Sequence, residues 1–572
     1  MRIYPAYAPE VRGPDGGWME RIRVEIVPGE ADAFFVKNES GKAVQVQEVC
    51  LAKLYCPMDT PFWAEGYNML SMYGGTLAKP ELTGTVSDRD HYHMPTPEGA
   101  FTVYNVLQLN LPDGFALYAF TTCKRFRGEF RLYADRIEVV QVLEGITLQP
   151  GETVELEQFM AGCAEEYSDL YEPLRERIRR GHPAPGGHVP TGWCSWYCYG
   201  TDIDLPLLTR NMEAIQSKLP QLRVFQIDDG YEKFMGDWLD ESDKLGISVG
   251  GLCRVIADHG MVPGIWTAPF TAEKDSRLFR EHPDWFVMDD EGRPLSSDRV
   301  TYPGWRAGPW YMLDASHPEA RGYLRDVFST MYEKLGCRYF KLDANMWGAL
   351  PFGRRHQPNC TSIEAYRMGM ETILEALGPD AFVLGCNAPL WPSLGLVHGM
   401  RISADILRDW PVVKQVAYEC FHRQYQHGSF WLSDPDCVLL HDGALTQEEK
   451  RFHLSCALAS CGAQIISDAM PELTDDEQSW MQTLLDNRLE HCVFLDSDCT
   501  LARGVCCTGA EVLLFFNPTD EEVRFSQKAA ETVYRELWSG EEKESTGELT
   551  VTLPAHAARV YLRQYPVNPK LS

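Results

Sequence analysis

The sequence lacks long hydrophobic runs and clusters of basic residues. Its apolar runs are all shorter than the roughly 18 consecutive residues that a membrane-spanning helix requires, so we predict no membrane span. Its 53 lysines and arginines stand against 82 aspartates and glutamates, which gives a formal net charge of −29. Because no basic cluster offsets this charge, neither nucleic acid nor an anionic membrane surface is expected as a partner.

The first residues, Met1 to Ala6, lack the basic start and the apolar core of a signal peptide. The 18 cysteines are scattered, and several, such as Cys253, Cys337 and Cys386, lie in apolar runs that suit buried thiols. This distribution favours reduced cysteines over a disulfide framework. We therefore expect a cytoplasmic protein.

The motifs of common cofactor and metal sites are also missing. There is no Gly-x-x-x-x-Gly-Lys-Ser/Thr sequence and no His-Glu-x-x-His sequence. The nearest approach to metal-ligand spacing is found in His91-x-His93 and in Cys194-x₃-Cys198, and neither has a matching second pair. The sequence thus predicts neither a bound cofactor nor a metal ion.

The pattern of apolar and polar residues changes twice along the 572 residues of the chain. Residues 20 to about 165 contain short alternating runs between turn signals, which is typical of β-strands. From about 190 to 490, short apolar runs alternate with longer amphipathic segments, as in repeated βα units, and after that the β-strand pattern returns. We predict a multidomain α/β plus β protein with an N-terminal β-sandwich domain (1–183), a (β/α)₈ TIM barrel (184–492) and a small C-terminal β domain (493–572).

Eight apolar runs in the central part are candidate barrel strands. The main alternative, an open doubly wound sheet, normally carries a Gly-rich phosphate-binding turn after its first strand, and the sequence has none. The capping-box pattern Thr446-Gln447-Glu448-Glu449 opens one of the helices expected between the strands. The predicted strands are 192–197, 224–228, 262–268, 339–343, 382–386, 400–403, 430–432 and 464–467.

Aspartates close four of these runs. They are Asp228 and Asp229, Asp343, Asp405, and Asp434 with Asp436. Because active sites of TIM barrels form at the carboxyl ends of the strands, these aspartates are expected to share one rim. Each could instead cap the helix that follows it. The occurrence of the pattern on four strands favours a carboxylate-lined pocket.

Aromatic residues gather at the same strand ends, although aromatic side chains also commonly fill protein cores. They are Trp193, Trp196, Tyr197, Tyr199, Trp266, Trp347 and Trp391. Rings that stack on the C–H faces of a sugar, beside carboxylates that hold its hydroxyl groups, form a sugar pocket, and Trp196 is one candidate ring. Two carboxylates also suit glycosidic cleavage, since one attacks the anomeric carbon or activates water while the other protonates the leaving oxygen.

The sequence around these residues resembles glycoside hydrolase family 36, the retaining α-galactosidases, and in particular its shorter bacterial members. The matching stretches span about 190 to 440, which is nearly the whole predicted barrel. They are 191–197, 224–229 with its continuation to 238, 263–270, 282–285, 339–343, 384–386, 399–402 and 430–437.

The resemblance implies an N-terminal β-sandwich, a catalytic barrel and a C-terminal β domain, and a double displacement with retention that needs no cofactor. It matches Asp343 to the nucleophile and Asp405 to the general acid/base. The family's sugar-binding positions correspond to Asp228 and Asp229, which bind the C4 and C6 hydroxyls, and to Trp266, Lys341, Cys386 and Arg401, which line the pocket. Cations beside the nucleophile would keep it ionised.

The sequence departs from the family at three places. The turn Cys386-Asn387-Ala388-Pro389 stands where Cys-Gly-Ser-Pro is common, and in the family this turn faces C2 of the sugar. Asn387 is therefore a candidate partner of the C2 substituent. The loop 67–74 carries Met and Leu where the family tends to have Trp, and Asp405 follows Ser-Ala where Gly-Pro is common.

We predict a retaining exo-α-glycosidase that hydrolyses terminal α-galactosides, whose partner is an oligosaccharide or glycoside substrate. An enzyme for a modified galactose-like sugar is an alternative, namely an α-galactosaminide, an α-N-acetylgalactosaminide or a β-L-arabinopyranoside. A transglycosylase of the raffinose-synthase kind and a catalytically silent sugar-binding protein are further alternatives. Association into a homo-oligomer is left open.

Overall fold

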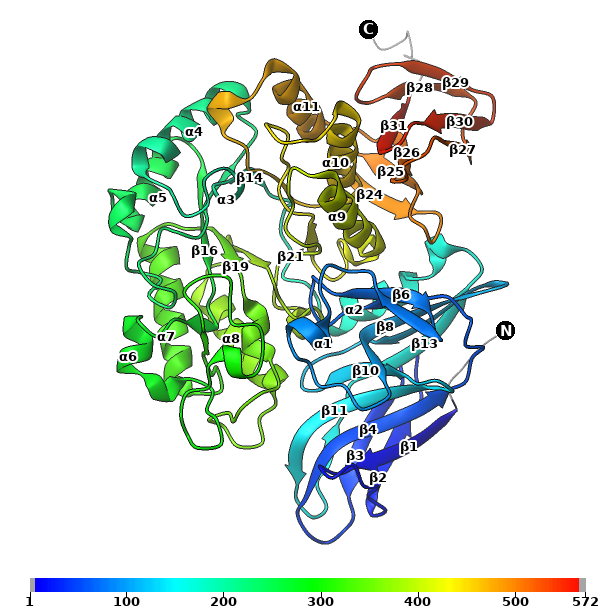
Figure 1. Cartoon of the computed structure of the whole chain (residues 1–572), viewed down its shortest axis with the longest axis vertical. Coiled ribbons are helices and arrows are strands. Elements are labelled where there is room, and N and C mark those ends of the chain that lie inside the picture. The colour runs from blue at the N-terminus through cyan, green and yellow to red at the C-terminus, as the bar shows by residue number, and fades with distance from the viewer. Residues whose placement is uncertain (1–5, 565–572) are drawn as a thin grey trace.

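The computed structural model describes residues 6–564 of the chain (Figure 1). Figure 1 shows a β-rich N-terminal part in blue and cyan, a central part in green and yellow with helices around its strands, and a small β part in orange and red. This arrangement confirms the predicted fold class. No helix within residues 6–564 is long and apolar enough to cross a membrane.

The N-terminal part contains two antiparallel sheets. Strand β2 (Ile22–Val27) alternates more buried and more exposed positions, so one face of its sheet turns to the core. Phe34 and Val36 of the smaller sheet and Phe130 and Val139 of the larger sheet are all buried, as expected for the inner faces of a β-sandwich. The smaller sheet contains β12 (Thr153–Glu155), β3 (Ala33–Asn38) and β2; the larger contains β1 (Tyr7–Arg12), β4 (Val44–Leu54), β11 (Ile137–Leu148), β10 (Arg127–Leu132), β8 (Phe101–Leu111), β5 (Phe62–Glu65), β6 (Met72–Thr76), β7 (Lys79–Leu82), β9 (Gly114–Phe120) and β13 (Phe159–Ala164).

Eight parallel strands form the central sheet. The seventh and eighth strands of the set are joined by backbone hydrogen bonds from Ala463 N–H to the Ser433 carbonyl at 2.8 Å and from Val438 N–H to the Ile465 carbonyl at 2.7 Å. These bonds link residues in or beside β22 and β23 and nearly close the sheet into a barrel, so the alternative of an open doubly wound sheet is wrong. The strands are β14 (Thr191–Cys194), β15 (Val224–Ile227), β16 (Val262–Thr267), β19 (Tyr339–Leu342), β20 (Phe382–Gly385), β21 (Gly399–Arg401), β22 (Leu432–Asp434) and β23 (Gln464–Ile466).

Helices surround this barrel (Figure 1). Helix α10 (Gln447–Ala459) begins at the predicted capping box: the Thr446 hydroxyl accepts the N–H of Glu449, and the Glu449 carboxylate accepts the N–H of Thr446. The other helices of the barrel part are α3 (Trp196–Tyr199), α4 (Leu205–Lys218), α5 (Val249–Asp258), α6 (Arg277–Glu281), α7 (Pro318–Ser329), α8 (Ser362–Ala376), α9 (Trp410–His422) and α11 (Asp475–Asp486). Two short helices, α1 (Asp88–His91) and α2 (Glu172–Gly181), precede the barrel.

Six of the eight predicted strands have nearly the predicted bounds, and two differ from them. The first predicted strand ends at Cys194, because the next residues turn into α3, where Gly200 N–H bonds the Trp196 carbonyl at 2.7 Å. The seventh begins at Leu432, because Phe430 N–H is bonded to a carbonyl of the preceding turn at 3.0 Å. In both places a local turn hydrogen bond prevails over the apolar pattern.

The C-terminal part is a six-stranded antiparallel sheet with an accompanying two-stranded pair. Trp538 fastens it to the barrel, since its indole N–H donates to the Ser455 hydroxyl of α10 at 2.8 Å. The predicted domain boundary after residue 183 falls between α2 and β14, and the predicted boundary after residue 492 falls inside β24. Both boundaries remain predictions. The strands are β24 (Leu489–Phe494), β25 (Leu501–Cys506), β26 (Glu511–Asn517), β31 (Ala557–Arg563), β28 (Thr532–Glu536) and β29 (Glu542–Ser545), with β27 (Val523–Lys528) paired to β30 (Glu548–Leu553).

Candidate active site

A pocket of about 300 Å³ lies at the carboxyl ends of the barrel strands. Arg401 is buried beside it with 2% of its surface exposed. Nine of the ten predicted site residues line the pocket: Trp196, Asp228, Asp229, Trp266, Lys341, Asp343, Cys386, Asn387 and Asp405. The strand pattern did not place the remaining lining residues there; they come from the end of α1, which supplies His91, and from loops, which supply Met69, Leu70, Tyr302 and Trp305.

Asp343 directly follows β19, and both of its carboxylate oxygens accept a hydrogen bond. The indole N–H of Trp266 donates to Oδ2 at 3.1 Å, and the backbone N–H of Ala344 donates to Oδ1 at 2.7 Å. Burial raises the pKa of Asp343 and the charge of Asp405 raises it further, whereas Lys341 and the indole N–H lower it. The carboxylate therefore has a fixed orientation in a poorly solvated place.

Lys341 lies two residues before Asp343 and bonds a second buried carboxylate. Its Nζ donates to Asp228 Oδ2 at 3.0 Å, and the same oxygen accepts from Gln226 Nε2 at 2.5 Å and from Cys194 Sγ at 3.4 Å. Burial alone would lower the pKa of Lys341, but the Asp228 charge raises it, so the ammonium stays protonated. Donors from three barrel strands thus orient Asp228 at the bottom of the pocket.

Asp405 is the exposed carboxylate of the site, with 64% of its side chain accessible. Arg401 Nη1 donates to Asp405 Oδ1 at 3.0 Å, and the same guanidinium pairs with Asp434 at 3.3 Å and Asp436 at 2.8 Å. Burial raises the pKa of Asp436 to about 6 in spite of this arginine. Asp434 and Asp436, which the strand pattern places on the rim, are therefore buried counter-charges of Arg401 and do not line the pocket.

Asp229 pairs with an arginine that sequence reasoning missed. Arg306 Nε donates to Asp229 Oδ2 at 2.7 Å, and its Nη2 bonds both Asp229 and Glu232. Burial and the neighbouring Asp229 raise the pKa of Glu232. Arg306 therefore supplies a positive charge beside a nearly inaccessible Asp229 and a second acidic group.

The loop that carries Arg306 also supplies two rings to the pocket. Tyr302 stacks on the imidazole of His91 with ring centroids 4.4 Å apart, and Trp305 packs edge-on against Trp310 at 4.6 Å. The Trp310 indole N–H in turn donates to the Arg306 carbonyl at 2.8 Å. The stretch Tyr-Pro-Gly-Trp-Arg offered a usable signal, because rings and an arginine stand together outside every predicted strand.

Asn387 is held by the N-terminal part of the chain. Its Oδ1 accepts from Asn68 Nδ2 at 2.9 Å and from the Tyr92 hydroxyl at 2.6 Å. Leu70 N–H donates to the Asn68 side-chain oxygen at 2.9 Å, which fixes the orientation of the Asn68 amide and hence that of Asn387. The Asn387 NH₂ group is therefore left as a hydrogen-bond donor in the pocket wall.

Arg423 joins the N-terminal loop to the barrel. This side chain is fully buried, pairs with Glu65 at 2.9 Å and donates to the carbonyl oxygens of Met69, Ser71 and Ile402. Ile402 immediately follows β21, the strand that leads to the exposed carboxylate of Asp405. One guanidinium thus sets the distance between the loop wall of the pocket and this strand end.

The histidines and cysteines with metal-like spacing do not converge. The His91 ring lies on Tyr302, while His93 Nδ1 lies 3.2 Å from the Val300 carbonyl. Cys198 Sγ donates to the Ser195 carbonyl at 3.5 Å. Each of these side chains has a local structural partner.

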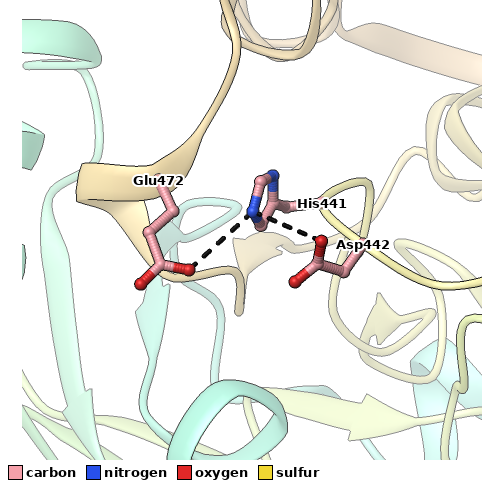
Figure 2. A group of neighbouring side chains, drawn as sticks. All are labelled: His441, Asp442 and Glu472. Carbon is pink, nitrogen blue, oxygen red and sulfur yellow. Dashed lines mark ion pairs between the residues drawn. The ribbon is translucent and has the colours of Figure 1, made fainter.

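Another group of potential ligands lies outside the pocket and is drawn in Figure 2. His441 Nε2 is 3.6 Å from an oxygen of Asp442 and 3.8 Å from one of Glu472, and its Nδ1 lies 3.0 Å from Glu477. Asp442 and Glu472 are well exposed. The contact of Nδ1 with Glu477 and the two longer contacts of Nε2 account for this geometry without a metal ion.

Residues 209–381 match the family model described as Melibiase. The chain is 23% identical over 265 residues to alpha-galactosidase AgaA of Geobacillus stearothermophilus, covering 40% of this chain and 32% of that protein. It is 30% identical over 222 residues to the A type blood alpha-D-galactosamine galactosaminidase of Flavonifractor plautii, covering 36% of this chain and 20% of that protein. The alignments thus span a third or less of these relatives' own length.

Among solved structures, the fold is similar to that of alpha-galactosidase TtGalA from Thermus thermophilus, which was determined in complex with p-nitrophenyl alpha-D-galactopyranoside. The TM-score is 0.63 at 23% sequence identity, and the match covers 84% of this chain and 98% of that chain. The two proteins share a fold.

Proposed function

We propose, on the premise of the match between residues 209–381 and the Melibiase family model, that the chain is a glycoside hydrolase acting on terminal α-galactosides. The observation that carries this proposal is the presence of two differently held carboxylates in one pocket. Asp343 is fixed in a buried place by two N–H donors, and Asp405 is exposed and held by Arg401. These environments suit a nucleophile and an acid/base that exchanges protons with the leaving group and with water.

In the first step a carboxylate oxygen of Asp343 attacks the anomeric carbon as the bond to the aglycone oxygen breaks. Asp405 gives its proton to that leaving oxygen, and the sugar becomes an ester of Asp343. The hydrogen bonds from Trp266 and Ala344 hold the attacking carboxylate in one orientation, which reduces the entropy lost on reaching the transition state.

In the second step Asp405, now ionised, takes a proton from water, and the water oxygen attacks the anomeric carbon and releases Asp343. Two inversions at the same carbon retain its configuration. Asp405 must therefore lose and regain a proton in each turnover. Its solvent exposure and its single bond to Arg401 leave it free to do so.

We place the hydroxyl groups of the sugar against Asp228 and Asp229, whose charges are balanced by Lys341 and Arg306. A charged acceptor strengthens a hydrogen bond from a hydroxyl and disfavours an epimer that cannot reach it. Trp266 provides one wall. The loop residues Met69, Leu70, Tyr302 and Trp305 surround the rest, which suits one terminal sugar and hence exo cleavage.

A panel of p-nitrophenyl glycosides that differ at C2, C4 and C6 tests the function. The α-galactoside should be cleaved faster than its C4 epimer, the α-glucoside, by about 10²-fold or more, because Asp228 and Asp229 would lose a hydroxyl partner. NMR of the first sugar released should show the α-anomer. Binding without turnover of any glycoside would favour a silent sugar-binding protein.

An α-galactosaminidase is the second candidate. The relative from Flavonifractor plautii is named for that activity, and Asn387-Ala388 replaces the Gly-Ser of the family pattern. The bonding of Asn387 nevertheless favours a C2 substituent that accepts a hydrogen bond, since Oδ1 is taken by Asn68 and Tyr92. A plain hydroxyl or an acetamido carbonyl meets this requirement, whereas a protonated amine would face another donor.

The C2 preference should change in the Asn387→Asp variant. Aspartate keeps the oxygen that Asn68 and Tyr92 bond, tolerates the positive φ of 40°, and replaces the donor NH₂ with a negatively charged acceptor. We expect the kcat/KM ratio of α-galactosaminide to α-galactoside to rise about tenfold at pH 6. The Asn387→Gly, Ala388→Ser double variant restores the common family sequence and is the reference. A ratio that is equal in all three proteins would show that this turn does not read C2.

The fall of kcat/KM at low pH, the acid limb of the pH profile, should reflect the protonation of Asp343. Burial and the Asp405 charge raise its pKa above the ordinary 3.8, and the nucleophile must be ionised, so kcat/KM should fall at a higher pH than for a solvated aspartate. In Asp405→Asn the neighbouring negative charge is gone, and the limb should move to lower pH with an activated aryl α-galactoside. Asp409→Asn, an exposed aspartate four residues away, should leave the limb in place.

A further inference from the structure

A second cavity, of about 500 Å³, lies between the N-terminal sheet and the barrel. Side chains of β4, β10 and β11 form one side of it. The loop that holds Pro95 and Pro97 and the barrel residue Pro351 form the other. It shares no lining residue with the catalytic pocket. The mechanism proposed above makes no use of it.

The cavity is lined by a buried arginine whose hydrogen-bonding capacity is not used. Arg127 is 2% exposed, and its Nε donates to Glu129 at 2.8 Å. Its Nη1 is paired only with the Glu144 carboxylate at 3.6 Å, and its Nη2 makes no hydrogen bond among residues 6–564, so the guanidinium keeps unused donor capacity. A buried donor left unpaired costs about 1–3 kcal/mol, so a ligand that accepts from it would be stabilised.

A second unpaired polar group stands in the same cavity. The side-chain amide of Gln47, on β4, makes no hydrogen bond within the part of the chain that the structure describes. Glu144 opposes it across the sheet and is itself held in place, because its carboxylate accepts the N–H of Ser362 at 2.8 Å and the Ser362 hydroxyl at 2.6 Å. The site is therefore built on rigid elements of both the sheet and α8.

The charges in the wall indicate what kind of molecule fits. Arg127 and Arg131 are matched by Glu48 and Glu144, and Arg131 already makes a bidentate pair with Glu48 at 2.8 and 2.9 Å. Two carboxylates in the wall repel an anion, and two guanidiniums repel a cation. A neutral molecule with many hydroxyl groups can accept a hydrogen bond from Arg127 and can donate to or accept from the side-chain amide of Gln47.

We propose that this cavity binds one or two rings of a neutral oligosaccharide at a second, non-catalytic site. The hydroxyl groups of the sugar contact Arg127 and Gln47, and its C–H groups pack against the apolar pyrrolidine rings of Pro95, Pro97 and Pro351. The volume of about 500 Å³ admits one or two sugar rings.

The site is tested by calorimetric titration of the full-length Asp343→Asn protein with raffinose, with inorganic phosphate as the anionic probe. We expect two classes of raffinose site. Gln47→Ala should weaken the second class about 3- to 10-fold, the value of one or two hydrogen bonds, and Thr96→Trp should abolish it by filling the cavity. Gln45→Ala, an exposed glutamine two residues away on β4, should change neither class.

Gln47→Ala and Thr96→Trp in the otherwise native protein should leave kcat/KM for an aryl α-galactoside within about twofold, which shows that the chain still folds. A single class of raffinose site that Gln47→Ala does not alter would overturn the proposal. So would phosphate binding that competes with the second raffinose molecule. Loss of the catalytic class alone would count against the proposed function and not against this site.

Discussion

Replacing Asp343 by asparagine should lower kcat/KM for every α-galactoside by about 10⁴-fold or more, because no other carboxylate can form the covalent intermediate. The side chain keeps its size and its place below Trp266. Its NH₂ group would face one of two N–H donors, which costs about 1–3 kcal/mol, but the variant no longer buries a negative charge. We therefore expect the melting temperature to change little.

Azide distinguishes a lost nucleophile from a damaged pocket. In Asp343→Ala the space left by the carboxylate can admit azide, which should restore turnover of an aryl α-galactoside and give a β-galactosyl azide by a single inversion. The Asp409→Asn protein serves as the control and should show native turnover and no azide product. Turnover of Asp343→Asn within tenfold of the native protein would refute the assignment.

Replacing Asp405 by alanine should produce a loss that depends on the leaving group. Proton transfer by a positioned carboxyl contributes about 10²- to 10⁴-fold, so kcat/KM for raffinose should fall by that factor. A dinitrophenyl α-galactoside leaves without protonation and should lose less than about tenfold in kcat/KM. Its kcat should still fall, because water must attack the intermediate without a general base.

Arg401, which bonds Asp405, is not a suitable position at which to test this prediction. Arg401 is buried with two further carboxylates, and truncating it would leave Asp434 and Asp436 without their counter-charge, so the arginine itself is a poor test. Asp405 is exposed, and its removal should not unfold the chain. Equal losses of kcat/KM for raffinose and for the dinitrophenyl substrate would exclude the acid role.

The polar residues at the strand ends of the barrel could be predicted because their place depends on a local sequence pattern. A polar residue that closes a buried parallel strand lies at the carboxyl end of the barrel whatever the rest of the chain does. Asp228, Asp343 and Asp405 obey this rule, and the structure places all three in the pocket wall. The same rule does not separate these residues from Asp434 and Asp436, because the arginine that buries those two is identified only by three-dimensional packing.

The loop walls of the pocket could not be predicted for a related reason. Asn68 and Asn387 are 319 residues apart, and Arg306 and Asp229 are 77 residues apart. Neither pair belongs to a periodic segment, so no hydrophobic pattern brings them together. The departure at Asn387 was visible in the sequence. Its meaning became clear only with the two donors that occupy its oxygen.

The hydrogen bonds of Arg423 to the N-terminal loop determine whether the N-terminal part and the barrel can be separated or exchanged between proteins. The guanidinium bonds Glu65 and two loop carbonyls on one side and the backbone after β21 on the other. A barrel expressed alone would bury this cation without Glu65, the carboxylate that pairs with it, and would leave the Asn387 side of the pocket open to water. Grafting a foreign N-terminal sheet onto the barrel would change substrate choice without altering any barrel residue. We therefore expect the substrate specificity of this protein to depend on both the N-terminal loop and the barrel.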